Sequence, residues 1–177
     1  YELVYQYEDT YWHAGINLYY MDYKDQLVLT GELNEIGEPM AANVADSYRM
    51  GIELMAGFRL GRHFSWDINA TWSRNRVQDF TETLYENEDV TGEKWVIHHG
   101  DTPIAFSPDF LLNSGLAYKY RRFEVSLQSQ YVSKQYMSNA AQEEHRLDAY
   151  FVSNLSMAYT FKLPKTKSIT VGATIYN

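Results

Sequence analysis

The sequence predicts an all-β protein, an antiparallel up-and-down meander of about eight strands that forms a segment of a transmembrane β-barrel. Three observations predict this fold. Long segments alternate apolar and polar residues with period two, the apolar faces of the clearest segments carry no charge, and the connections are alternately short and long. Every second connection of a meander lies at the same end of the sheet, and outer-membrane barrels likewise have short turns at one end and long loops at the other.

Composition limits the alternatives. The chain has 177 residues, enough for one domain, and no cysteine, so neither disulfides nor thiolate metal sites stabilise it. Mean hydropathy is −0.45, and no apolar run approaches about 18 residues, which excludes a transmembrane helix but not a barrel of half-apolar strands. The net charge of −8 argues against a nucleic-acid partner, because a phosphate backbone requires a basic surface.

The first two strands are separated by a polar turn at residues 8–10. Residues 3–7 form a short apolar stretch, and the second strand begins at Trp12 and continues to Leu29. Its apolar face carries alternate residues: Trp12, Ala14, Ile16, Leu18 and Tyr20. A loop rich in Gly, Asn, Glu and Pro then follows at residues 31–39.

The third strand, at residues 44–60, shows the alternation best. One face carries Met50, Ile52, Leu54, Ala56, Phe58 and Leu60. The other face carries Ser47, Arg49, Gly51, Glu53, Met55, Gly57 and Arg59. After a tight connection at residues 61–63, the fourth strand repeats the pattern from Phe64 to Trp72.

The fourth strand is followed by an acidic segment without clear period at residues 79–102, which we expect to be a long loop containing Glu82, Glu86, Glu88, Asp89 and Glu93. The remaining strands are expected at residues 106–118, 123–131, 151–161 and 169–176. Short connections are expected near residues 8–11, 61–63, 119–122 and 162–167, and long ones near 31–42, 79–104 and 138–147.

Aromatic residues lie near the short turns, where a membrane barrel has an interfacial girdle. We predict five membrane-interface aromatics: Phe64, Trp66, Tyr118, Phe123 and Phe161. A Lys or Arg at mid-bilayer on the apolar face would cost about 2–4 kcal/mol. Outer-membrane lipid is therefore an expected partner of this face, and the cell outer membrane the expected location.

Four segments carry a further signal: LYYMDYKDQLVLTG (18–31), WDINATWSRNR (66–76), TPIAFSPDFLLNSGLAY (102–118) and ITVGATIYN (169–177). Together they resemble the C-terminal barrel region of TonB-dependent outer-membrane receptors, across essentially the whole chain. The resemblance implies a 22-stranded barrel plugged by a separate N-terminal domain. We therefore expect residues 1–177 to be part of such a barrel, with both ends cut and the plug domain and the final strand outside the chain.

The resemblance also implies a function. Receptors of this family take up scarce, bulky ligands, mostly ferric siderophores, and others import haem, cobalamin or glycans. Energy comes from a periplasmic contact with TonB, made by an N-terminal part outside this chain. The expected function is thus outer-membrane uptake of a ferric siderophore, and the identity of the ligand stays open.

No catalytic constellation is present, because the chain has no Gly-rich phosphate loop, no H-E-x-x-H and no G-x-S-x-G. His98 and His99 lie beside Asp101, but neighbours on a strand point to opposite faces, so the pair converges only at a turn. The acidic residues between Glu82 and Glu93 lack the spacing of a calcium loop. We predict no enzyme activity, no metal site and no cofactor.

Seven residues are ligand-binding candidates. Arg49, Arg74 and Arg76 lie near the expected loop end, where arginines above the lumen would attract an anionic ferric siderophore. The alternative for the arginines is pairing with neighbouring acids. Four further candidates lie in expected long loops, where their rings are available to grip a ligand: Tyr85, Trp95, His98 and Tyr136.

Two other architectures stay open. A complete eight-stranded outer-membrane barrel with a structural or adhesion role matches the length and strand count, although its last strand would need a closing turn after Ile175 and its first strand is shorter than the 9–11 residues of a spanning strand. A soluble lipocalin-like carrier would turn Met50, Ile52 and Leu54 inward.

Overall fold

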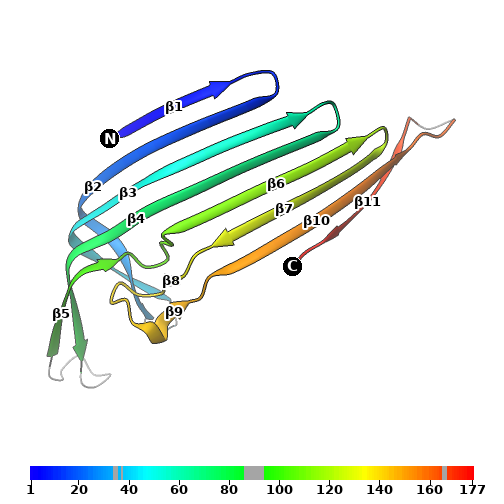
Figure 1. Ribbon diagram of the computed structural model, residues 1–177. Helices are drawn as coiled ribbons and strands as arrows, with labels where there is room; N and C mark the ends of the chain where they lie inside the picture. Colours follow the sequence, from blue (N-terminus) through cyan, green and yellow to red (C-terminus); the bar gives the residue numbers. More distant parts are fainter. Residues whose placement is uncertain (34–35, 37, 86–93, 165–166) are drawn as a thin grey trace.

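The computed structural model describes residues 1–33, 36, 38–85, 94–164 and 167–177 (Figure 1). The elements in chain order are β1 (Glu2–Glu8), β2 (Trp12–Leu33), β3 (Pro39–Leu60), β4 (Phe64–Tyr85), β5 (Lys94–Pro103), β6 (Phe110–Tyr120), β7 (Phe123–Val132), β8 (Gln135–Tyr136), the 3-10 helix η1 (Glu143–His145), β9 (Arg146–Leu147), β10 (Tyr150–Phe161) and β11 (Ile169–Ile175). Among the described residues, no helix has the length and apolarity needed to cross a membrane.

The sheet is a meander in which each long strand pairs with its neighbours in sequence. The order is β1-β2-β3-β4-β6-β7-β10-β11, with β5 paired to the far end of β4, and every pairing is antiparallel. β1 and β11 form the two edges, so the sheet is open in the described part of the chain (Figure 1). The predicted all-β meander of about eight strands is confirmed.

The two ends of the sheet differ in construction. The links β1–β2, β3–β4, β6–β7 and β10–β11 all lie at one end, which we call the turn end (Figure 1). The opposite end, the loop end, carries β5, β8, η1 and β9. The predicted alternation of connections is therefore confirmed.

Strand register separates an apolar face from a polar face. One lateral row of paired residues is apolar across six strands: Ile16, Leu54, Ala70, Leu112, Tyr131 and Phe151. A parallel row on the other face is small or polar: His13, Gly57, Asp67, Gly115, Gln128 and Asn154. Leu54 is 50% exposed and Phe151 is 60% exposed, so no other described part of the chain covers the apolar face at these residues.

Aromatic side chains bound the apolar face at both ends. On β4 it runs from Phe64 to Trp72, which pair with Tyr118 and Phe110 of β6. Eight residue steps separate these ends, a length of about 26 Å along the strand. An apolar band of this size between aromatic girdles is typical of transmembrane barrels.

The five predicted interface aromatics all lie on the apolar face near the turn end. Three of them are the apolar-face residues closest to the turns, namely Phe64, Phe123 and Phe161, whereas on β6 Tyr120 lies closer to the turn than Tyr118. Trp66 lies one apolar-face position further from its turn, and its indole Nε1–H donates to Ser114 Oγ at 2.9 Å. That bond gives Trp66 an internal partner for its polar atom.

The expected long loop at residues 79–102 is wrong for the part that the structure describes. β4 continues to Tyr85, and β5 returns along it through pairs such as Thr83↔Val96 and Leu84↔Trp95. β-Branched and aromatic residues favour this extension, and two register shifts near Phe80 conceal its period. Glu86, Glu88, Asp89 and Glu93 lie outside the described residues.

Two other expected boundaries are also wrong. β2 and β3 extend to Leu33 and from Pro39, into the loop expected at residues 31–42. The strand expected from residue 106 begins only at Phe110. Phe106 has a φ of 53°, a left-handed conformation that interrupts an extended strand.

The small buried core lies where these strands extend beyond the membrane-sized sheet. Val28, Val44, Val77 and Ile104 form it, and Phe80 packs against it. Elsewhere the sheet is a single layer, so its stability there comes from strand pairing and from its surroundings rather than from a second protein layer.

We predict that a charge is tolerated on one face and not on the other. Ile68 lies midway between Phe64 and Trp72 on the apolar face, and its neighbour Asn69 lies on the polar face. In lipid vesicles, Ile68→Lys should lower the free energy of unfolding by about 2–4 kcal/mol because the ammonium enters hydrocarbon. Asn69→Lys should change it by less than about 1 kcal/mol; equal losses in denaturant titrations would contradict lipid contact by the apolar face.

Candidate functional site

The polar face of the sheet carries a network of side-chain hydrogen bonds. Asn17 Nδ2 donates to Glu2 at 2.8 Å and to Glu53 at 3.1 Å. Asn113 Nδ2 donates to Asn69 Oδ1 at 3.0 Å, linking β6 to β4. Such a wall is suited to water or a polar ligand.

Residues 104–109, between β5 and β6, fold against this wall at the loop end. We call them the inner segment. The Ser73 backbone N–H donates to the Asp109 carbonyl at 2.9 Å, and Ser73 Oγ donates to the Pro108 carbonyl at 3.1 Å. Asn75 Nδ2 donates to Ser73 Oγ at 3.0 Å, and both side chains are buried. The inner segment is thus held on β4 by groups that the strand pairing leaves free.

Asn139 fixes the other side of the inner segment. It is fully buried, and its Oδ1 accepts the Ala105 backbone N–H at 2.7 Å. The next amide, Phe106 N–H, donates to the Tyr136 carbonyl at 2.8 Å. Sequence reasoning missed Asn139, because a lone Asn in a polar loop carries no pattern that distinguishes a buried residue from an exposed one.

Arg49 lines a hollow of about 450 Å³ between the wall and the inner segment. Its guanidinium Nη1 donates to Ser107 Oγ at 3.3 Å. The hollow combines one cation with aromatic, amide and hydroxyl groups from Tyr19, Asn75, Phe106 and Ser107. Acids also reach it, through Glu2 and Glu53.

Arg76 and Tyr136 line a second hollow, of about 300 Å³, which shares Ser107 with the first. The Arg76 Nη1 atom lies 3.7 Å from Asp109 Oδ1. Lys134 Nζ lies 5.9 Å from the centre of the Tyr136 ring. The structure therefore brings Arg49, Arg76 and Tyr136 to adjoining hollows around the inner segment.

Tyr136 is also part of a charged cluster beside η1. Its hydroxyl donates to Glu143 Oε1 at 2.8 Å. This hydrogen bond, helped by the nearby Arg146 guanidinium, lowers the pKa of Glu143. The same bond raises the pKa of Tyr136, because ionising the phenol would break it and place two negative charges together.

The other four candidates lie elsewhere. Arg74 pairs with Met50 on the apolar face, two residues beyond Trp72. Its side chain therefore lies on the opposite face of the sheet from Arg49. Trp95 and His98 are exposed residues of β5 rather than of a loop. Tyr85 ends β4, and its side chain lies outside the described residues.

His98 and His99 have different partners on β4. His98 Nδ1 is 3.2 Å from Thr81 Oγ1, whereas His99 Nε2 is 2.8 Å from Glu82 Oε2. Glu82 is only 16% exposed and is paired with His99 on the neighbouring strand, although the sequence places it in an expected loop. Within the part of the chain that the structure describes, no three His, Asp or Glu residues gather as a metal site.

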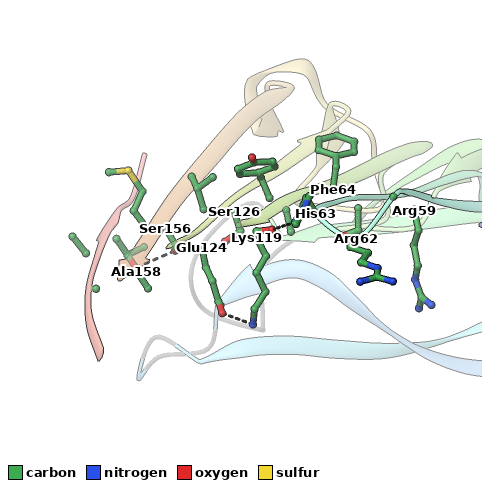
Figure 2. Close-up of a pocket in the computed structure, with 18 residues that line it drawn as sticks. Arg59, Arg62, His63, Phe64, Lys119, Glu124, Ser126, Ser156 and Ala158 are labelled. Atoms are coloured by element: carbon green, nitrogen blue, oxygen red, sulfur yellow. Dashed lines mark hydrogen bonds and ion pairs between the residues drawn. The ribbon is translucent and has the colours of Figure 1, made fainter. Parts of the chain in front are cut away.

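A third hollow, of about 560 Å³, lies on the polar face at the turn end (Figure 2). Arg59, Arg62, Lys119 and Glu124 point to the same side there, away from Phe64. Lys119 and Glu124 form an ion pair. None of the seven ligand-binding candidates lines this hollow, whereas two of the predicted interface aromatics, Phe64 and Tyr118, do.

Residues 1–177 match the family model described as TonB dependent receptor-like, beta-barrel. Among solved structures, similar chains include the copper transporter OprC (TM-score 0.63, 18% identity, 99% of this chain and 24% of that chain). A mutant ferric enterobactin receptor PfeA from Pseudomonas aeruginosa gives a TM-score of 0.60 at 19% identity, over 99% of this chain and 24% of that chain.

The siderophore receptor PiuA from Acinetobacter baumannii gives a TM-score of 0.69 at 13% identity, over 97% of this chain and 22% of that chain. The chain thus spans less than a quarter of the length of these three structures. A search of curated proteins finds no match.

We predict that Asn139→Ala loosens the inner segment. The substitution leaves the buried Ala105 N–H without an acceptor, at a cost of about 1–3 kcal/mol. Hydrogen–deuterium exchange of the Ala105 and Phe106 amides should accelerate. Asn69→Ala, which removes an exposed hydrogen bond, should leave those amides unchanged, and unchanged exchange in Asn139→Ala would contradict the role of Asn139.

We predict that the hydrogen-bonded cluster around η1 becomes less ordered at low pH. The ionised Glu143 has a lowered pKa, so its stabilisation is complete above the ordinary carboxyl pKa of about 4.3 and is lost as pH falls through the lowered value. The raised pKa of Tyr136 keeps its contribution complete below about pH 10. Protection of the Met137 and His145 amides should therefore be constant from about pH 5 to 9.

In the same experiment, Tyr136→Phe should move the acid loss of protection to higher pH, because Glu143 loses the bond that lowers its pKa. Tyr150→Phe, which removes an exposed hydroxyl nearby, serves as the control. An identical acid profile in Tyr136→Phe and the parent would refute the coupling.

Proposed function

This chain belongs to the TonB-dependent receptor-like β-barrel family, and from that membership we propose that the protein containing it takes up a scarce, bulky ligand across the outer membrane. The family consists of outer-membrane receptors and transporters rather than enzymes. Ligand uptake then requires three things of this chain: a lipid-facing surface, a polar lumen wall and a place on that wall where ligand binds.

The observation that carries the proposal is the distribution of charge between the two faces. The apolar row is uncharged and uncovered, and the polar face carries the hollow that Arg49 lines beside the inner segment. We propose that the apolar face contacts outer-membrane lipid and that the polar face lines the lumen. The chain then forms part of the wall of a larger barrel, with its plug domain and final strand elsewhere in the polypeptide.

This arrangement is preferred to the two alternatives. A complete eight-stranded barrel requires β1 to pair with β11, whereas these strands are the open edges of the sheet. A lipocalin-like carrier would use the apolar face as its interior, yet the inner segment folds on the polar face. Both observations favour a segment of a large transmembrane barrel.

We propose a ferric siderophore as the ligand class. Two of the similar structures are a ferric enterobactin receptor and a siderophore receptor. On this chain, Arg49 and Arg76 supply cations, and Tyr136 supplies a ring, beside hollows near the loop end. Guanidinium groups bind carboxylate and catecholate oxygens by charge-assisted hydrogen bonds. TonB would contact the N-terminal part of the polypeptide, outside this chain.

We predict that Arg49→Gln weakens ligand binding by the full-length receptor about 10- to 100-fold, because it removes a charged hydrogen-bond donor from the ligand hollow. Arg74→Gln removes the same charge from the apolar face and should have an effect below about twofold. Binding is measured by fluorescence quenching with ferric siderophores, haem, cobalamin and copper as separate ligands. Growth of a deletion strain on each iron source reports uptake.

Receptor abundance in the outer membrane is compared by immunoblot so that lost expression is not mistaken for lost binding. Equal affinity of the Arg49→Gln and parent receptors for every ferric siderophore that supports growth would remove Arg49 from the ligand site.

A further inference from the structure

The apolar face ends, at the turn end, in a cluster of rings and one guanidinium. Tyr118 and Tyr120 are 41% and 43% exposed and both lie on the apolar face. The His63 ring lies 5.2 Å from the Tyr120 ring, edge-on at 72°, and 6.4 Å from the Tyr118 ring. His63 is held there by a 2.8 Å hydrogen bond from its Nδ1 to the Lys119 carbonyl.

Arg121 completes this cluster. Its guanidinium carbon lies 5.2 Å from the centre of the Tyr120 ring, which places the charge on the apolar side of the β6–β7 turn. Arg122 follows at the same turn, and its carbonyl accepts the Thr160 N–H at 2.9 Å, so the β10–β11 hairpin lies alongside. No ion pair within 4 Å involves either arginine in the described part of the chain.

The charge of these turns is opposite to that of the chain. The net charge of the whole chain is −8, yet residues 61–63, 121–122 and 162–168 contain only basic ionisable groups. The β1–β2 link is different, since Glu8 ends β1 and Asp9 lies in the link. Three neighbouring turns of the four at this end therefore carry only basic ionisable groups.

The position of these cations relative to the membrane indicates that their partner is a lipid phosphate. Exposed Tyr residues at the end of an apolar face mark the boundary between hydrocarbon and headgroups. Arg121 and Arg122 lie one and two residues beyond Tyr120, at about the depth of the lipid phosphates. An unpaired guanidinium stacked on a ring at that depth is suited to bidentate contact with phosphate oxygens.

We propose that His63, Tyr118, Tyr120, Arg121 and Arg122, the turn-end patch, bind the headgroup of an anionic phospholipid in the leaflet that meets the turns. The inference rests on the proposed lipid contact of the apolar face and is independent of which ligand is taken up. Tyr118 and Tyr120 contact the acyl–headgroup boundary, and the two arginines contact the phosphate.

The test uses the full-length receptor purified in detergent and titrated with phosphatidylglycerol, with lipid retention followed by native mass spectrometry. The Arg121→Gln/Arg122→Gln receptor should bind phosphatidylglycerol about tenfold or more weakly, since each cation near an anionic surface contributes about fivefold. Phosphatidylethanolamine binding should be unchanged in that variant. Millimolar inorganic phosphate should compete weakly, because it lacks the acyl chains that contact the tyrosines.

The matched control is Arg59→Gln/Arg62→Gln. It removes the same charge at the same end, but these side chains point to the polar face, away from Phe64 (Figure 2). It should bind phosphatidylglycerol like the parent. Equal retention by the parent and the Arg121→Gln/Arg122→Gln receptor, or equal losses in both double variants, would overturn the proposal.

Heat-modifiable electrophoretic mobility confirms that each variant is folded. The result is separable from the proposed function: a receptor that takes up no ferric siderophore would still show the difference between the two double variants. Loss of phosphatidylglycerol and phosphatidylethanolamine binding together would point to failed insertion of the apolar face and would also overturn the patch.

Discussion

The structure depends on one constraint: a single-layer sheet has to face hydrocarbon on one side and water on the other. Backbone groups are satisfied within the sheet by antiparallel pairing, so the side chains alone decide which face tolerates hydrocarbon. Alternating apolar and polar residues keep each face uniform only if neighbouring strands pair in the correct register. A shift of one residue in that pairing would exchange the two faces of a strand. The row from Ile16 to Phe151 and the row from His13 to Asn154 show that the register holds.

At the loop end the physical problem changes. β2, β3 and β4 run beyond β6, and here a small core of Val28, Val44 and Val77 replaces the surroundings as the source of burial. The inner segment packs on the polar face and brings backbone amides with it. Asn139 accepts a hydrogen bond from one of those amides, and Ser73 donates one to a carbonyl. These bonds matter because a buried polar group without a partner destabilises the fold by more than a typical hydrogen bond stabilises it. Polar residues therefore fix the hollows that the ligand candidates line.

The sequence predicts those strands in which apolar residues recur at every second position and all lie on one face. The strand at Met50 to Leu60 is readable because every second residue is apolar and none of those is charged. The β4–β5 hairpin was missed because bulges near Phe80 shift the period. The inner segment was missed because its order depends on Asn139, distant in sequence. Position along the chain groups Arg74 and Arg76 with Arg49, although parity places both on the other face of the sheet.

Face and depth together decide what an arginine on this sheet contacts. Arg49 and Arg59 lie on the same face of β3, ten positions apart, so they line the polar wall at its two ends. Arg74 and Arg121 lie on the apolar side, each just beyond an aromatic residue that ends the uncharged band. The same guanidinium therefore meets water and solutes in the first case and a headgroup layer in the second. Residue type alone does not separate the roles of these four arginines, whereas parity and distance from the nearest girdle ring do.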